Sequence, residues 1–293
     1  MFFKSKWDPR GRHCYITGGS SGLGLALAIL LTKKGAHVSI VARNEERLQK
    51  ALEAVEAARQ TPDQVLKSYA FAVNTEVGAV ASIEAASEAH GGKSPDAFFL
   101  CAGASSPRFF VEQDEASMRK GMDETYWAQA ASALAASKRM VSRREKGKLV
   151  FVSSFLGYFS LVGYAPYSPG KFAIRGLAEA LQSEFLLYDI DVHIAFPGTI
   201  YTPGYEEENR TSPRNGDFHI TYDFLGHVFR ASTAGSSPRN SYLTDMFYGL
   251  IGFVALPFWR SSVDSTVRKH RREHEEYLSG LGLYRDETSS STK

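Results

Sequence analysis

Short, almost uniformly apolar segments alternate with helix-like segments along the first 224 residues. The apolar segments, which predict strands, are residues 13–19, 36–43, 68–73, 96–103, 147–155, 191–198 and 216–224. Helical spacing of apolar residues predicts helices at 21–35, 44–60, 75–90, 123–141 and from 167 onward. Strands that are apolar on both faces, each followed by a helix, indicate a parallel sheet covered on both sides. The predicted fold is therefore α/β, a doubly wound, Rossmann-like parallel sheet of about seven strands.

Composition narrows the classes of partner. The chain has 293 residues and a formal net charge of +2, so its overall charge gives no reason to expect binding to nucleic acid. Two cysteines, Cys14 and Cys101, are too few for a disulfide framework or a zinc site, and we expect no metal. We divide the chain into a nucleotide-binding domain at 1–240, an apolar and basic extension at 241–280, and a tail at 281–293.

The stretch TGGSSGLG joins the first predicted strand to its helix. Its glycine spacing allows a tight turn and a close approach of the backbone to a pyrophosphate at the helix N-terminus, where free N–H groups and the helix dipole stabilise an anion. The loop residues expected to hold a dinucleotide are Gly18, Ser20, Ser21, Gly22, Leu23 and Gly24.

The second predicted strand ends at Arg43, where an NAD enzyme usually carries an acid for the ribose hydroxyls. A carboxylate at this place would repel a 2′-phosphate, whereas an arginine attracts one. The sequence therefore predicts NADPH as the cofactor, with Arg47 one turn along the next helix in a supporting role or on a solvated helix face.

Tyr167 and Lys171 are four residues apart and therefore project from one helical face, and Ser154 ends the fifth predicted strand. Reduction of a ketone needs a hydride on carbon and a proton on oxygen. A neighbouring ammonium lowers the pKa of a phenol, and a serine hydroxyl can position the carbonyl. Pro169 and Gly170 are tolerated because a first helical turn has unpaired N–H groups, and we expect Gly170 to let the cofactor come close.

Together these motifs resemble the short-chain dehydrogenase/reductase family over roughly residues 10–225. The resemblance implies that Ser154, Tyr167 and Lys171 are catalytic. It also implies pairing of subunits through the helices at 123–141 and 167–187. The further positions that it implies for cofactor binding are Val73, Ala102, Gly103, Pro197, Gly198, Ile200 and Thr202.

The chain departs from the family pattern at several positions. Thr125 stands where the family often has an asparagine that helps to hold a water on a proton relay; its backbone carbonyl is retained, so we expect a modified relay. Cys101 replaces a second asparagine, and Ala72 replaces an aspartate that often meets adenine. Only about 20 residues separate Gly198 from the last predicted strand, which indicates either a truncated substrate lid or an omitted mobile segment.

Three further stretches, YSPGKFAIRGLAEALQSE, TPGYEEENRT and VDSTVR, resemble family members that act on a long-chain lipid ketone. This resemblance implies NADPH-dependent reduction of 3-oxosphinganine at the cytosolic face of the endoplasmic reticulum. One alternative is another lipid carbonyl, such as a steroid, a retinoid or acyl-dihydroxyacetone phosphate. A second is a non-catalytic nucleotide-binding scaffold.

Residues 246–259 form an apolar stretch that we expect to meet a membrane or a partner surface. As a helix of 14 residues it would reach about 21 Å, short of a bilayer core of roughly 30 Å. Pro257 should kink or end that helix, and the basic cluster at 268–272 suits anionic lipid. We therefore favour an interfacial or re-entrant segment, with a subunit interface or an ordinary core helix as alternatives.

Overall fold

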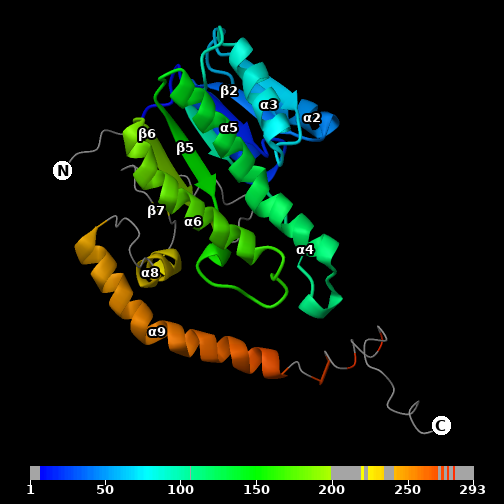
Figure 1. Cartoon of the computed structure of the whole chain (residues 1–293), viewed down its shortest axis with the longest axis vertical. Helices are drawn as coiled ribbons and strands as arrows, with labels where there is room; N and C mark the ends of the chain where they lie inside the picture. Colours follow the sequence, from blue (N-terminus) through cyan, green and yellow to red (C-terminus); the bar gives the residue numbers. More distant parts are fainter. Residues whose placement is uncertain are drawn as a thin grey trace.

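The computed structural model describes residues 7–105, 107–198, 219–220, 224–233 and 241–269, together with 272–273, 276 and 280. Its centre is a parallel sheet in the order β3-β2-β1-β4-β5-β6-β7 (Figure 1). The strands are β1 His13–Thr17, β2 His37–Ala42, β3 Leu66–Ala70, β4 Ala97–Leu100, β5 Gly147–Val152, β6 Ile190–Ala195 and β7 His219–Ile220. The predicted α/β doubly wound sheet is confirmed. Its first six strands end within three residues of their predicted limits, and β7 is a two-residue pairing with β6.

Helices cover both faces of the sheet because successive side chains of a strand point to opposite sides. Cys14 and Ile16 of β1 pack in one core, whereas Tyr15 between them packs in the other. The helices are α1 Gly22–Lys33, α2 Glu45–Glu56, α3 Glu76–Glu88, α4 Glu115–Met122, α5 Ala128–Ser142, α6 Ser168–Glu184, α8 Phe224–Ser232 and α9 Tyr242–Lys269. The two cysteines, Cys14 and Cys101, are free.

The helix predicted at 123–141 is only partly right. A π-helical turn, η2, occupies Asp123–Trp127, and α5 follows it as a regular helix. The sequence analysis also missed α4, which precedes η2. This short helix has no buried residue and hence no apolar stripe to reveal it, but its start is fixed locally because Asp114 accepts a hydrogen bond from the amide of Ser117 at 2.8 Å.

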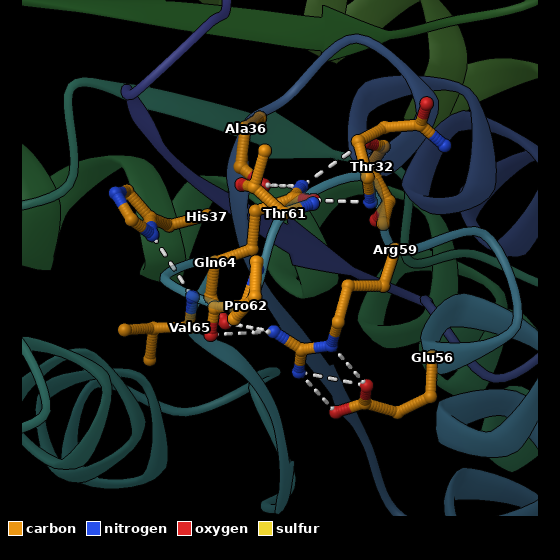
Figure 2. Close-up of polar contacts among 10 residues, drawn as sticks. Thr32, Ala36, His37, Glu56, Arg59, Thr61, Pro62, Gln64 and Val65 are labelled. Carbon is orange, nitrogen blue, oxygen red and sulfur yellow. Dashed lines mark hydrogen bonds and ion pairs between the residues drawn. The ribbon is translucent and has the colours of Figure 1, made fainter.

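The connection between α2 and β3 is held by a buried glutamine, as Figure 2 shows. Gln64 Nε2 donates to the carbonyl oxygens of Thr32 at 3.0 Å and Ala36 at 2.7 Å. Its Oε1 accepts from the amides of Gln60 at 2.6 Å and Thr61 at 3.1 Å. The amide group is fully used, so one side chain ties the crossover loop to the end of α1 and fixes the start of β3.

The C-terminal helices form a unit against the sheet end that carries β6. Arg230 of α8 and Asp245 of α9 make a bidentate ion pair in which both side chains are almost completely buried. Farther along α9, Trp259 packs edge-on against Phe159 and Phe229, with ring centroids 4.9 Å and 5.3 Å away. These contacts anchor α9 to the domain. The proposed division at residue 240 lies beside residues outside the described part and stays a prediction.

The long α9 corrects the expected length of the apolar segment. The helix runs for 28 residues and continues past Pro257, so the proline does not end it; Figure 1 shows α9 bending along its course. Within the described part of the chain, Tyr242–Trp259 is the helical window long and apolar enough to cross a membrane. Most of that window is exposed, which argues against an ordinary core helix. Within the basic cluster at 268–272, residues 270 and 271 lie outside the described residues.

Candidate active site

A cleft of about 610 Å³ opens at the carboxyl ends of the central strands. The sheet order reverses between β1 and β4, which is where ligands bind in open parallel sheets, because the loops from neighbouring strands diverge there. The walls of the cleft come from the segments that follow β1, β2, β3, β4, β5 and β6, together with η2 and the start of α6. Residues far apart in the sequence therefore meet in one place.

The glycine loop forms the floor of this cleft. Gly18 has a φ of +67°, and a Cβ there would lie 3.0 Å from the backbone of Ala102 on the neighbouring segment. A Cβ on Gly24 would overlap the carbonyl oxygen of Gly18. Ser21 is the N-cap of α1, and among the described residues no side chain caps that helix. The first-turn N–H groups thus remain available to an anion in the cleft.

Arg43 and Arg47 line the cleft near the end of β2. Arg47 is placed by a local cap, since its amide donates to Asn44 Oδ1 at 2.8 Å. The side chain of Arg43 is 68% exposed, so its guanidinium is accessible to a ligand. The two cations lie on the side of the cleft where the predicted 2′-phosphate would bind.

Ser154, Tyr167 and Lys171 also line the cleft. Ser154 follows β5, and its Oγ accepts from the amide of Leu156 at 3.2 Å. Tyr167 is the N-cap residue of α6, as expected for a helix beginning beside it, and Lys171 lies in the first turn. Lys171 Nζ donates to the carbonyl oxygen of Val152 at 2.9 Å and lies 5.4 Å from the centroid of the Tyr167 ring.

The protonation of these groups differs from the sequence-based expectation. Burial raises the pKa of Tyr167, and a hydrogen bond with Ser154 lowers it in part. Burial lowers the pKa of Lys171 itself to about 8, opposed by Cys101. The expected lowering of the phenol pKa by the ammonium is therefore not found, and at neutral pH the phenol retains its proton.

Gly170 has a different role from the one expected. It is buried and is not among the described residues that line the cleft; a Cβ there would overlap the hydroxyl of Thr125. The missing side chain therefore allows α6 to pack against η2 rather than the cofactor to approach. Thr125 is fully buried, and its hydroxyl donates to the carbonyl oxygen of Gly121 at 2.5 Å. Its side chain thus fixes the junction of two elements and does not reach the cleft.

The other predicted cofactor positions within the described residues all line the cleft. These are Gly18, Ser20, Ser21, Gly22, Leu23, Gly24, Arg43, Arg47, Val73, Ala102, Gly103, Pro197 and Gly198. Ile200, Thr202 and the expected lid between Gly198 and residue 218 lie outside the described residues. Sequence reasoning missed Asn74, Asp123 and Glu124, because no motif marks them.

The residues present fit a nicotinamide dinucleotide. Three features support this fit: a glycine loop that lines the cleft, a helix N-terminus without a side-chain cap for the pyrophosphate, and two arginines for a further phosphate. No group of three or more His, Cys, Asp or Glu residues suited to a metal ion occurs in the described part of the chain.

Comparisons with known proteins agree with this geometry. The chain is 39% identical over 97% of its length to a 3-ketodihydrosphingosine reductase of Cryptococcus neoformans, of which it covers 92%. It is 34% identical over 91% of its length to a 3-dehydrosphinganine reductase of Danio rerio, of which it covers 88%. Among solved structures, the chain resembles a putative short-chain alcohol dehydrogenase from Sinorhizobium meliloti, with 27% sequence identity and a TM-score of 0.61. That match covers 69% of this chain and 79% of the other. Levodione reductase has 26% identity and a TM-score of 0.61, covering 68% of this chain and 75% of that one.

The model of the short chain dehydrogenase family matches residues 12–213, which include the glycine loop, Ser154, Tyr167 and Lys171. The chain belongs to the short-chain dehydrogenase family.

Proposed function

We propose that this protein reduces 3-oxosphinganine to sphinganine with NADPH. The observation that carries the proposal is the meeting of Ser154, Tyr167 and Lys171 at the nicotinamide dinucleotide cleft. The substrate follows from the relatives in fungi and fish, whose names state this reaction. The choice of NADPH follows from Arg43, because its exposed guanidinium suits a 2′-phosphate.

The side chains of this site have distinct tasks in the reduction. When bound, the dinucleotide supplies a hydride to the carbonyl carbon. Tyr167, which burial keeps protonated, gives the proton of its hydroxyl to the carbonyl oxygen. The Ser154 hydroxyl holds the same oxygen, and its hydrogen bond with Tyr167 favours the phenolate that remains. The amine of Lys171 would hold the nicotinamide ribose. The backbone carbonyl of Thr125 serves the relay that returns a proton.

The C-terminal helix supports association with the endoplasmic reticulum membrane from its cytosolic side. Along α9, the side chains of Met246, Phe247, Leu250, Phe253 and Phe258 are each more than half exposed. A row of large apolar side chains of this extent is unfavourable in water and marks a membrane or protein contact. The 18-residue window would extend about 27 Å as a helix, close to the thickness of a bilayer core.

Pairing of two copies through η2, α5 and α6 is part of the same proposal. Trp127, Leu134 and Phe172 on these elements each have more than two fifths of their surface exposed. Among the described residues none of the three belongs to a hydrophobic core cluster, and a second copy is the partner that the family resemblance implies. The division into a domain at 1–240, an extension at 241–280 and a tail also belongs to the proposal.

Two other functions remain to be separated by experiment. The catalytic groups suit ketones in general, which favours another lipid carbonyl compound as the substrate. A non-catalytic scaffold is favoured by Thr125 in place of asparagine. The decisive assay measures NADPH oxidation by the purified full-length chain in detergent micelles with 3-oxosphinganine, a steroid ketone or a short-chain ketone. Rapid turnover of 3-oxosphinganine alone supports the proposal; turnover of none of the three contradicts it.

A further inference from the structure

Glu124 lies within the cofactor cleft and faces the arginine that we assign to the 2′-phosphate. Its Oε1 is 4.0 Å from Arg43 Nη2 and 3.9 Å from Lys120 Nζ. Arg43 and Glu124 both line the cleft, one from the end of β2 and the other from η2. The ion pair therefore joins two walls between which a dinucleotide would lie.

The two partners differ in their freedom to move. Glu124 has a side chain that is only 18% exposed, and its backbone carbonyl accepts a hydrogen bond from the amide of Ala104 at 3.3 Å. Arg43 follows the end of its strand, and its side chain is 68% exposed. A ligand that competes for this pair would consequently move the arginine, while the carboxylate stays at the wall of the cleft.

We infer that Glu124 is a specificity-determining residue that competes with the 2′-phosphate of the cofactor for Arg43. The inference rests on the proposed use of NADPH. A cofactor with a 2′-hydroxyl lets Arg43 keep its carboxylate partner. A 2′-phosphate takes the guanidinium away, which leaves a mostly buried carboxylate near a dianion with Lys120 as its remaining described cationic partner. Glu124 therefore weakens binding of NADPH and of its oxidised form, and speeds release of that oxidised cofactor.

The test measures cofactor binding rather than turnover. Fluorescence titrations of the full-length protein give the Kd for NADPH and for NADH in the wild type and in Glu124→Gln, which removes the charge and keeps the shape. We expect Glu124→Gln to bind NADPH about fivefold more tightly, as for an ion pair worth about 1 kcal/mol, and to bind NADH as before. Glu115→Gln is the matched control, because Glu115 pairs with Arg119 at 2.7 Å on α4 away from the cleft; it should change neither Kd.

Two further variants make the inference specific. Lys120→Met should weaken NADPH binding, since Glu124 then lacks this cation once Arg43 has moved. In an Arg43→Gln background, Glu124→Gln should lose most of its effect, because there is no guanidinium to compete for.

An equal loss of affinity for both cofactors in Glu124→Gln would show that the carboxylate holds a group common to both, and would overturn the inference. An unchanged Kd for NADPH would overturn it as well. A wild type that does not bind NADPH contradicts the proposed function itself.

Discussion

We predict that His13 makes the folded protein sensitive to acid. Its ring is almost fully buried at the start of β1, and Nε2 is 2.8 Å from Ser39 Oγ. It stacks on His90 with ring centroids 3.7 Å apart, and His37 meets His90 edge-on at 5.3 Å. Among the described residues, His13 Nδ1 has no hydrogen-bond partner. A proton on this nitrogen would be a buried charge without an acceptor.

Burial lowers the pKa of His13 from 6.5 to about 3; His90, His37 and Lys93 lower it further, and Asp96 opposes them. The unfolded chain therefore binds a proton at pH 5 that the folded chain does not. Stability from this group is complete above pH 6.5 and is lost progressively as the pH falls toward 3. Linkage gives a loss of about 2 kcal/mol in the free energy of unfolding between pH 7.5 and pH 5.

Urea unfolding at pH 7.5 and pH 5 measures this difference in the wild type and in His13→Phe. Phenylalanine keeps a flat ring for stacking but cannot take up a proton. We expect the variant to be less stable at pH 7.5, because Ser39 loses its hydrogen bond with His13, yet to lose about 2 kcal/mol less than the wild type on acidification. Equal losses in the two proteins would refute the reasoning, since the acid sensitivity would then come from other groups.

Three further predictions concern the site and its support. Tyr167→Phe should keep NADPH affinity within about twofold and lower kcat by about 10³-fold, because it removes the proton donor and leaves the glycine loop intact. Titration measures the affinity, and single-turnover rates measure the loss of activity. Unchanged turnover contradicts the mechanism. Arg43→Glu should shift the ratio of kcat/KM values from NADPH toward NADH, because a carboxylate repels the 2′-phosphate; an unaltered ratio places that phosphate elsewhere. Asp245→Asn should lower the free energy of unfolding by about 3–5 kcal/mol, since it leaves the buried Arg230 without its counter-charge. Chemical unfolding measures this loss. A change below about 1 kcal/mol contradicts the prediction.

Local chemistry was enough to predict most of the frame of the site. Apolar strands alternating with helices specify a parallel sheet, and the carboxyl ends of its strands must then share one edge. The four-residue spacing of Tyr167 and Lys171 puts them on one helical face whatever surrounds them. A glycine loop between a strand and a helix likewise has few conformations open to it, so the sequence identifies Gly18 and Gly24 as positions that need glycine.

Other properties depend on what lies across space from a residue, and sequence spacing carries no record of that. The sequence predicts that Gly170 faces the cofactor, but its neighbour is Thr125, brought there by the packing of α6 on η2. An ammonium one turn away predicts a lowered pKa for Tyr167, yet burial raises that pKa. Glu124 belongs to no motif and becomes notable only because the fold sets it opposite Arg43. Helical and strand periodicity are set by bonds along the chain, whereas desolvation and charge pairing are set by the atoms that folding brings within a few ångströms, and only the tertiary structure decides which those are.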